Sequence, residues 1–326
     1  MRYSAHDTAL DGHRIIQLED TETDTRVSIS PEFGNNAFEF RHRGHNYLWQ
    51  PTDGFQAFYG KRALFGVPFL SPWANRLDQD SYWVNDAQFT VNRNLGNIRD
   101  DQNHKPIHGL MIYQSWQVDR LSADTTAACS RCSFRFSGKP HLMAQFPFAH
   151  RLEMTHMLRD GRLHVRLRLE NECEEMLPVA IGFHPYYTLP GSREGWAVQI
   201  PATKHVELSA ANIPTGGYTA NPYSGYTPMR AAQFDDVFTG LTRGREGWAV
   251  FRVRNNSASL SVGFGQKYPV GIVYSPKGSS FICFEPMAAL TNAFNLAHAG
   301  FDSELQNVEP GNAWEEEFWI QPGMPA

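Results

Sequence analysis

The chain has 326 residues, of which 41% are hydrophobic and 19% are charged, a balance typical of a folded globular protein. Its formal net charge is −5 and its lysines and arginines form no run of like charges, which argues against nucleic acid and anionic membranes as partners. No apolar stretch reaches the roughly 20 residues that span a bilayer, and the N-terminal segment lacks the apolar core of a secretory signal. We therefore expect a cytoplasmic protein.

Short segments of alternating apolar and polar residues recur along the whole chain, the pattern of half-buried strands. In chain order they are RIIQLE, TRVSIS, NAFEFRH, YWVNDAQFTV, CSFRFS, RLHVRLRLE, WAVQI, WAVFRVR, SLSVGF and EEFWIQ. The clearest is residues 162–170, in which four apolar residues alternate with charged or polar ones. This segment is predicted to be an antiparallel strand with one solvent-exposed face.

Turn residues separate these segments, since 20 prolines and 26 glycines are spread evenly between them. No window longer than about a dozen residues shows the periodicity of a helix. The sequence therefore predicts an all-β protein built as a large antiparallel sandwich or barrel. Because no linker, composition break or repeat divides the chain, residues 1–326 are predicted to form a single domain.

The cysteines and the histidine pair give little support for a metal or redox site. Cys129 and Cys132 form a CxxC pair, but it lies in a strand-like segment and no second CxxC follows. His104 and His108 are four residues apart, but Pro106 between them prevents the helix that would place both on one face. We expect neither a metal nor another cofactor.

Two apolar runs end in an ionisable residue that is followed by proline: LPVAIGFHPYY contains His184, and SSFICFEPMAAL contains Glu285. Proline pushes the residue before it toward extended geometry, so both side chains are expected at strand ends on rigid backbone. One interpretation is a pair of polar strand ends. The other is an acid–base pair, because the apolar Phe281, Ile282 and Phe284 would raise the pKa of Glu285 to suit a general base.

Three further polar sites interrupt apolar surroundings. His108 lies in KPIHGL, a segment typical of a tight loop, and Asn75 and Arg76 lie in SPWANRL. Asp235 and Asp236 lie in FDDVF. Arg76 could pair with one of these aspartates or bind the hydroxyls of a ligand, and the sequence leaves open which aspartate faces the ligand.

Taken in order, PWANRL, IHGL, FPFAHRLEMTHMLRDGRLHVRLRLEN, GFHPYY, IPTG, FDDVF and CFEPMAALTNAFN resemble the landmarks of the aldose 1-epimerase (galactose mutarotase) family. Each string is weak alone, but seven in the right order over most of the chain form a specific signal. The resemblance implies a β-supersandwich of antiparallel strands with an open cleft. It also implies that the protein interconverts the anomers of a sugar.

The resemblance further implies a role for each candidate residue. His184 would protonate the ring oxygen as general acid, and Glu285 would take the proton of the anomeric hydroxyl as general base. The residues implied to bind the sugar are Arg76, His108, Asp235 and, more weakly, Asn75. The single glycine after His108 and the small apolar residues near Glu285 depart from the family pattern, which leaves the identity of the sugar open.

Other hypotheses stay open at this stage. Arg76, Arg62, Lys61 and Lys105 could neutralise the phosphate of a hexose phosphate. A non-catalytic carbohydrate-binding protein would share the fold. A glycosidase would need a carboxylate pair, for which the FDDVF aspartates and Glu285 are candidates.

Aromatic residues near the polar sites could pack on the apolar face of a sugar or belong to the core, and these are Trp73, Tyr186 and Phe294. The expected partner is a small sugar. The oligomeric state is expected to be a monomer or a homodimer.

Overall fold

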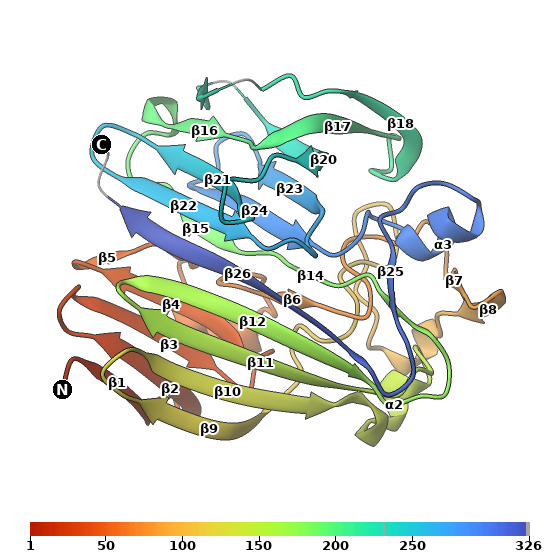
Figure 1. Ribbon diagram of the computed structural model, residues 1–326, viewed down its shortest axis with the longest axis horizontal. Helices are drawn as coiled ribbons and strands as arrows, with labels where there is room; N and C mark the ends of the chain where they lie inside the picture. Colours follow the sequence, from red (N-terminus) through yellow and green to blue (C-terminus); the bar gives the residue numbers. More distant parts are fainter. Residues whose placement is uncertain (224, 231, 324–326) are drawn as a thin grey trace.

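The computed structural model describes residues 1–223, 225–230 and 232–323, and these form antiparallel sheets joined by loops (Figure 1). Helices are short. The α-helices are α1 Ala57–Gly60, α2 Pro140–Met143 and α3 Ala293–His298. The 3₁₀ turns are η1 Gly54–Gln56, η2 Arg93–Leu95, η3 Phe136–Gly138 and η4 Arg193–Gly195. No helix in this part of the chain has the length and apolar character needed to cross a bilayer.

A five-stranded sheet at the N-terminus is a simple meander in which each strand pairs with the next. Its strands are β1 Tyr3–Leu10, β2 His13–Asp20, β3 Thr25–Ser30, β4 Asn36–His42 and β5 His45–Asn46.

A nine-stranded sheet runs through the molecule in the order β19-β16-β21-β22-β26-β12-β11-β10-β9. Its strands are β9 Gln117–Ala123, β10 Ala128–Arg135, β11 His150–Arg159, β12 Arg162–Asn171, β16 Ala197–Gln199, β19 Thr227–Pro228, β21 Ala249–Arg254, β22 Ser259–Phe264 and β26 Ala313–Gly323. Asp160 and Gly161 connect β11 to β12 with φ of 50° and 69°, the left-handed geometry of a tight hairpin turn. The strand predicted at residues 162–170 is thus β12.

An eight-stranded sheet has the order β18-β17-β20-β23-β24-β14-β6, and β15 pairs with β24 beside β14. Its strands are β6 Phe69–Leu70, β14 Gly182–Phe183, β15 Tyr186–Thr188, β17 Ala202–Leu208, β18 Pro214–Ala220, β20 Phe234–Leu241, β23 Val270–Ser275 and β24 Phe281–Met287. Two small sheets pair β7 Ser81–Val84 with β8 Ala87–Thr90, and β13 Leu177–Val179 with β25 Gln306–Val308.

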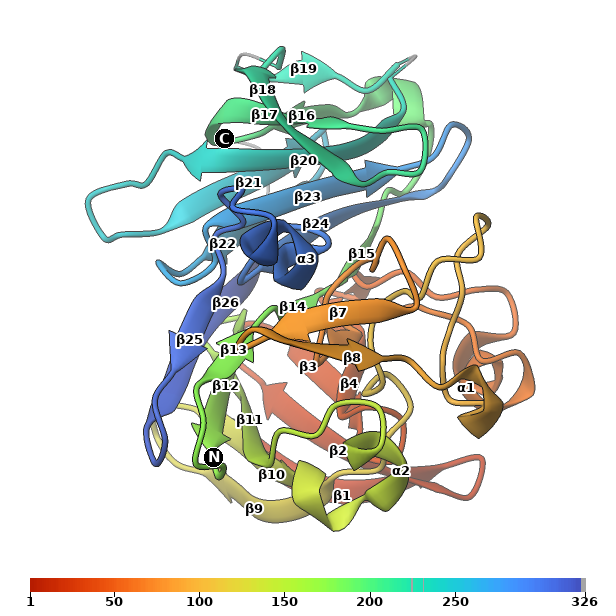
Figure 2. The ribbon, with the colours of Figure 1, turned by 90° about the vertical axis from the view of Figure 1, so that its right-hand side faces the viewer.

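The nine-stranded sheet is covered by the other two large sheets at opposite ends (Figures 1 and 2). Strands β10 and β11 at one end contact β2 of the five-stranded sheet. At the other end Phe251 of β21 lies 5.6 Å from Phe284 of β24, and Phe318 of β26 lies 4.8 Å from Phe183 of β14, between ring centroids. The predicted all-β antiparallel supersandwich is confirmed.

The apolar faces of all three large sheets meet in one cluster of buried side chains, to which Leu18, Leu167 and Phe284 contribute from the five-, nine- and eight-stranded sheets. Interdigitated apolar faces of this kind are what hold stacked sheets together. The assignment of residues 1–326 to a single domain stays a prediction.

Two expectations about strand boundaries are wrong. Residues 82–91 form the hairpin of β7 and β8 instead of one strand, because Asn85 and Asp86 adopt left-handed φ of 49° and 61° and turn the chain back. Glu285 lies inside β24, which continues to Met287, and not at the end of a strand. The extended geometry that a proline imposes on the residue before it is also strand geometry, so Pro286 does not end β24.

Candidate active site

A cavity of about 270 Å³ brings together all six residues that the sequence singles out as a site: Asn75, Arg76, His108, His184, Asp235 and Glu285. The rest of its wall consists of Leu64, Arg99, Asp100, Asp101, Gln102, Ile107, Tyr186, Ile272 and Tyr274. Strands of the eight-stranded sheet supply one side of this wall, and the loops around residues 64–76 and 99–108 supply the other.

His184 is held between two short strands. It directly follows β14, and its backbone N–H donates a hydrogen bond to the carbonyl oxygen of Pro68 at 2.9 Å. Its ring stacks on Tyr186 with centroids 4.6 Å apart and an interplanar angle of 12°. The imidazole is therefore fixed in direction by both backbone and packing.

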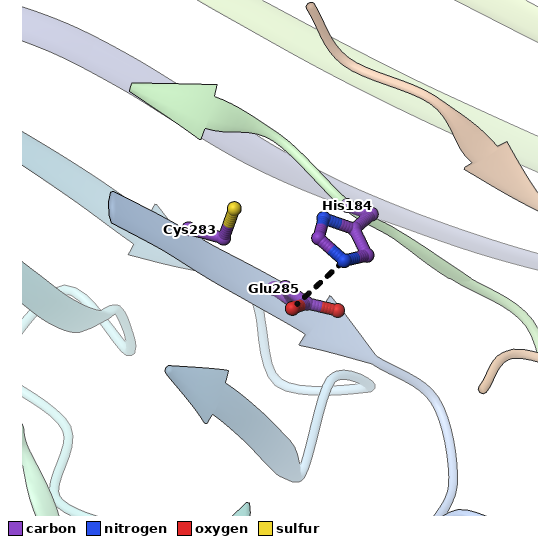
Figure 3. Close-up of side chains that lie close together, drawn as sticks. All are labelled: His184, Cys283 and Glu285. Carbon is purple, nitrogen blue, oxygen red and sulfur yellow. Dashed lines mark ion pairs between the residues drawn. The ribbon is translucent and has the colours of Figure 1, made fainter. Parts of the chain in front are cut away.

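Glu285 lies on β24 opposite Ile272 of β23, and its side chain reaches His184 (Figure 3). The Nε2 atom of His184 is 3.4 Å from Oε1 of Glu285. Neither Nδ1 of His184 nor Oε2 of Glu285 has a hydrogen-bond partner in the described part of the chain. Both groups thus keep hydrogen-bonding capacity for a ligand.

Burial controls the charge of this pair. It raises the pKa of Glu285 well above its ordinary value, and the nearby charge of Asp235 raises it further. It lowers the pKa of His184 to about 3, and Arg99 and Arg76 add to this effect. Without a ligand, the pair therefore favours a neutral carboxylic acid beside a neutral imidazole, and we regard the 3.4 Å contact as a polar contact between neutral groups and not as an ion pair.

Two loops place Asn75 and His108 side by side. Both residues have left-handed backbone, with φ of 57° and 65°, and the N–H of His108 donates to the carbonyl oxygen of Asn75 at 2.7 Å. The ring of His108 lies edge-on to that of His184, with centroids 5.3 Å apart. Burial is the largest cause that lowers the pKa of His108 well below its ordinary value, so its ring is neutral.

Arg76 is oriented by Asp101, whose Oδ2 accepts a 2.7 Å hydrogen bond from Nε. Nη1 of Arg76 also donates to Oδ1 of Asn75 at 3.0 Å. The partner of Arg76 is thus Asp101, and the alternative pairing with an FDDVF aspartate is wrong. A guanidinium has five N–H donors, so Arg76 keeps donors for a ligand.

The two aspartates of β20 point to different places. Asp235 lines the cavity, and its Oδ2 accepts a 3.0 Å hydrogen bond from Nδ2 of Asn212. Oδ1 of Asp236 instead lies 2.8 Å from Nε2 of His205 on the neighbouring strand β17. Of the pair, Asp235 is the one placed to meet a ligand.

Of the three aromatic candidates, one lines the cavity and two belong to the core. Tyr186 lines the cavity. Trp73 and Phe294 are buried in the main core, where their rings lie 6.1 Å and 5.5 Å from the ring of Tyr82. Trp73 and Phe294 are core residues.

Of the four basic residues considered for phosphate binding, Arg76 is the one that lines the cavity. Lys61 pairs with Asp53, and Lys105 donates to the carbonyl oxygen of Asp78. Neither lysine belongs to the cavity wall, and the same holds for Arg62.

Several residues of the cavity wall were not predicted from the sequence. Asp101 and Arg99 lie in the polar stretch IRDDQNHKP just before His108, a signal that could have been read as a binding loop. Tyr274 gives no such signal. It reaches the cavity because β23 pairs with both β20 and β24, where Tyr274 faces Asp235 and Cys283.

One group in the described part of the chain has the chemistry and spacing of a metal site. A nitrogen of His184, the sulfur of Cys283 and an oxygen of Glu285 all lie within 4.8 Å of one another. Cys129 and Cys132 are free thiols on β10 and belong to no such group.

Comparison with known proteins agrees with this architecture. The family model described as aldose 1-epimerase matches residues 15–321. A galactose mutarotase-like protein from Clostridium acetobutylicum superposes with a TM-score of 0.88 at 17% identity, over 99% of each chain. A Synechocystis protein gives a TM-score of 0.78 at 21% identity, over 98% of this chain and 100% of the other. Galactose 1-epimerase from Lactobacillus acidophilus gives a TM-score of 0.76 at 13% identity, over 99% of this chain and 98% of the other.

At these identities the solved structures establish the shared fold. The family match does more, because its residues 15–321 include every residue of the cavity wall. The chain therefore belongs to the aldose 1-epimerase family.

Proposed function

We propose that the protein is an enzyme that interconverts the α and β anomers of a free hexose by opening and reclosing the sugar ring. The observation that carries this proposal is the pair of His184 and Glu285, 3.4 Å apart in the wall of a cavity rich in hydrogen-bonding groups. The cavity of about 270 Å³ lies just below the roughly 300–1,000 Å³ of sites for drug-sized ligands, which suits a monosaccharide.

Opening a hemiacetal ring requires one proton to leave the anomeric hydroxyl and one to reach the ring oxygen. In our proposal the Glu285 carboxylate accepts the first proton, and the His184 imidazolium donates the second. Opening thus converts the charged pair into a neutral pair. Rotation about the C1–C2 bond and reclosure with the protons reversed then give the other anomer and restore the charged pair.

The neutral state that burial favours is therefore the state of the pair after ring opening. The charged state before opening needs support from the sugar. Hydroxyl groups that donate to Glu285 replace the solvation lost on burial, and its free Oε2 can accept such a bond. With the sugar bound, the pair can then adopt both the charged and the neutral state during one catalytic cycle.

The remaining polar residues would hold the sugar. Arg76 offers its free N–H donors, His108 a neutral ring whose Nδ1 has no partner in the described part of the chain, and Asp235 a carboxylate. Asn75 would act mainly by orienting Arg76. The face of Tyr186 provides an apolar surface for the ring of a pyranose.

A free hexose suits this wall better than a hexose phosphate. The wall contains the carboxyl groups of Asp100, Asp101, Asp235 and Glu285 against only two guanidinium groups. Of these two, Arg76 already pairs with Asp101. Competition between hexose and hexose 6-phosphate separates the two substrates, and a preference for the phosphate that weakens with salt would refute the free-hexose assignment.

The central test is proton NMR of a freshly dissolved α-anomer. Wild-type protein should accelerate anomer exchange, and His184→Ala or Glu285→Gln should each lower the rate about 10²–10⁴-fold. Asp236→Asn is the matched control, because Asp236 bonds to His205 outside the cavity. A folded wild type that accelerates exchange of no aldose would refute the proposal.

Calorimetry distinguishes a non-catalytic sugar-binding protein, for which heat of binding would appear without any anomer exchange. Release of product from an aryl glycoside would instead point to a glycosidase. The cytoplasmic location and the oligomeric state of monomer or homodimer stay predictions.

A further inference from the structure

Cys283 lies two residues before Glu285 on β24, so both side chains leave the same face of the strand. Its cross-strand neighbours are Tyr186 of β15 and Tyr274 of β23, which both line the cavity. Figure 3 shows the three side chains grouped over β24, with the sulfur of Cys283 to the left of the His184 ring and the carboxyl group of Glu285 below that ring. The thiol of Cys283 therefore lies next to the proposed acid–base pair, on the same strand as Glu285.

The ligand atoms of the three residues are close enough to share an ion. The sulfur, one imidazole nitrogen and one carboxylate oxygen lie within 4.8 Å of one another, and the residues are 0%, 6% and 2% exposed. Around a tetrahedral zinc ion, with bonds of about 2.0–2.3 Å, ligand atoms stand roughly 3.3–3.8 Å apart. The Nε2–Oε1 distance of 3.4 Å already falls in this range, and the 4.8 Å limit for the whole group exceeds it by no more than about 1.0–1.5 Å.

The donor set selects a class of ion. Thiolate and imidazole favour zinc and similar thiophilic ions, whereas magnesium and calcium require oxygen ligands. Three protein ligands would leave a fourth position toward the cavity, which His184 and Glu285 line. The carboxyl group of Asp235, which lies in the same wall close enough to Glu285 to raise its pKa, would help to attract a cation to this position.

We propose that His184, Cys283 and Glu285 form a binding site for a thiophilic divalent cation of the zinc class, and that this ion blocks the epimerisation. On binding, the thiol and the His184–Glu285 pair each release a proton to solvent, bonds form from sulfur, nitrogen and oxygen to the ion, and no electron is transferred. The inhibition rests on the proposed function, because the bound ion would take His184 and Glu285 away from their role as acid and base. The binding of the ion does not depend on the proposed function.

Cobalt(II) tests the binding without any assay of activity. A thiolate bound to cobalt(II) gives a charge-transfer absorption in the near ultraviolet, which wild-type protein should show and Cys283→Ala should lose. Cys132→Ala is the matched control, since Cys132 is also a buried free thiol but lies on β10. Absence of the band from wild type, or its persistence in folded Cys283→Ala, would overturn the site. If Cys283→Ala does not fold, Cys283→Ser provides the same comparison.

Zinc titration of anomer exchange then tests the inhibition. Zinc should inhibit wild type in competition with sugar, a chelator should restore the rate, and magnesium should have no effect. Cys283→Ala should keep its rate without zinc and require at least about tenfold more zinc for half-inhibition. Equal sensitivity of Cys283→Ala and wild type would overturn the inhibition. If metal-free wild type shows the cobalt band but does not accelerate anomer exchange, the proposed function is refuted and the metal site is not.

Discussion

At the scale of single residues, burial determines what the His184–Glu285 pair can do. Near neutral pH an exposed glutamate would be ionised and an exposed histidine partly protonated, whereas burial lowers the pKa of His184 to about 3 and raises that of Glu285. The two groups then act as a unit that holds one proton. A unit of this kind can deliver and recover a proton in one place without exchange with solvent.

This unit predicts a broad pH profile for kcat/KM. Loss of activity on the acid side needs a second proton on His184, whose pKa is about 3, and loss on the alkaline side needs removal of the proton that the raised pKa of Glu285 retains. The rate of anomer exchange by NMR should therefore show no acid limb as the pH is lowered from about 7 to about 5. An acid limb near pH 6.5, where an ordinary histidine titrates, would show that the pair is not coupled in this way.

The adjacent aspartates of β20 offer a second prediction. Asp235→Asn removes a charged hydrogen-bond acceptor from the cavity and should lower kcat/KM by about ten- to a hundredfold. Asp236→Asn changes the contact to His205 and should leave kcat/KM within about twofold of wild type. NMR exchange rates at several sugar concentrations provide both values. Equal effects of the two substitutions would contradict the assignment of Asp235 to the site.

The residues of the site were predictable where local sequence fixes local geometry. The proline after His184 and after Glu285, and the glycine after His108, restrict the backbone at the residue that carries the chemistry. Tyr274 was not predictable, since only the pairing of β23 with β20 and β24 brings it to the cavity. The choice between Asp235 and Asp236 likewise depends on which face of β20 meets the cavity.

At the scale of elements, the cavity depends on a close approach of two loops. Gly109 has φ of 64°, and its Cα faces the backbone of Ser71, whose carbonyl oxygen would lie 2.2 Å from a Cβ atom. The N–H of Leu110 donates to that same oxygen at 2.6 Å. A glycine here thus allows the loop of His108 to pack against the loop of Arg76.

Gly109→Ala should therefore lower the free energy of unfolding by more than about 2 kcal/mol, through both left-handed strain and the clash with Ser71. Gly96→Ala is the matched control. Its φ of 66° is nearly the same, but no atom lies within 4 Å of its added Cβ, so its cost should be about 1 kcal/mol. Urea unfolding measures both. Equal costs would mean that the contact with Ser71 has no effect on stability.

The elements themselves were predictable to the extent that turn chemistry is local. Segments such as TRVSIS and SLSVGF coincide with β3 and β22, because the residues on either side favour turns. The hairpin of residues 82–91 was missed, since Asn85 and Asp86 interrupt an otherwise continuous alternation without a glycine or proline. Left-handed asparagine and aspartate are a weaker signal than glycine.

At the scale of the whole molecule, the cavity wall draws on residues 64–285, and the sheets that carry them are built from strands far apart in sequence. Strand β26, near the C-terminus, lies between β22 and β12 in the nine-stranded sheet. Alternation predicts that a strand exists but not which strand lies beside it. The supersandwich arrangement was therefore predicted from the family resemblance, whereas the residue pattern alone predicted only an antiparallel sandwich or barrel.

The core that joins these sheets contains two histidines of β11, His150 and His156, which are 0% and 1% exposed. Nδ1 of His150 contacts the carbonyl oxygen of Phe148 at 2.7 Å, whereas Nδ1 of His156 has no partner in the described part of the chain. Burial lowers the pKa of His150 to about 4 and that of His156 to about 3. Both rings are neutral in the folded protein near neutral pH.

These histidines predict how stability depends on pH. Above about pH 6.5 neither the folded nor the unfolded chain protonates them to a large extent, and they do not reduce the stability of the fold. As the pH falls below 6.5, the unfolded chain binds protons that the folded chain excludes, until the folded pKa values of about 3 and 4 are reached. Each buried histidine should thus lower the free energy of unfolding by up to about 1.4 kcal/mol per pH unit in this range.

His156→Met isolates one of these contributions, since carboxyl groups that also titrate are common to variant and wild type. Urea unfolding between about pH 6 and pH 4 should give a slope smaller by about 1.4 kcal/mol per pH unit in the variant. His45→Met, at an exposed position of β5, is the control and should keep the slope of wild type. If His156→Met loses stability with acid as steeply as wild type does, the folded core must admit the proton on His156, and its burial would not be the cause of acid sensitivity.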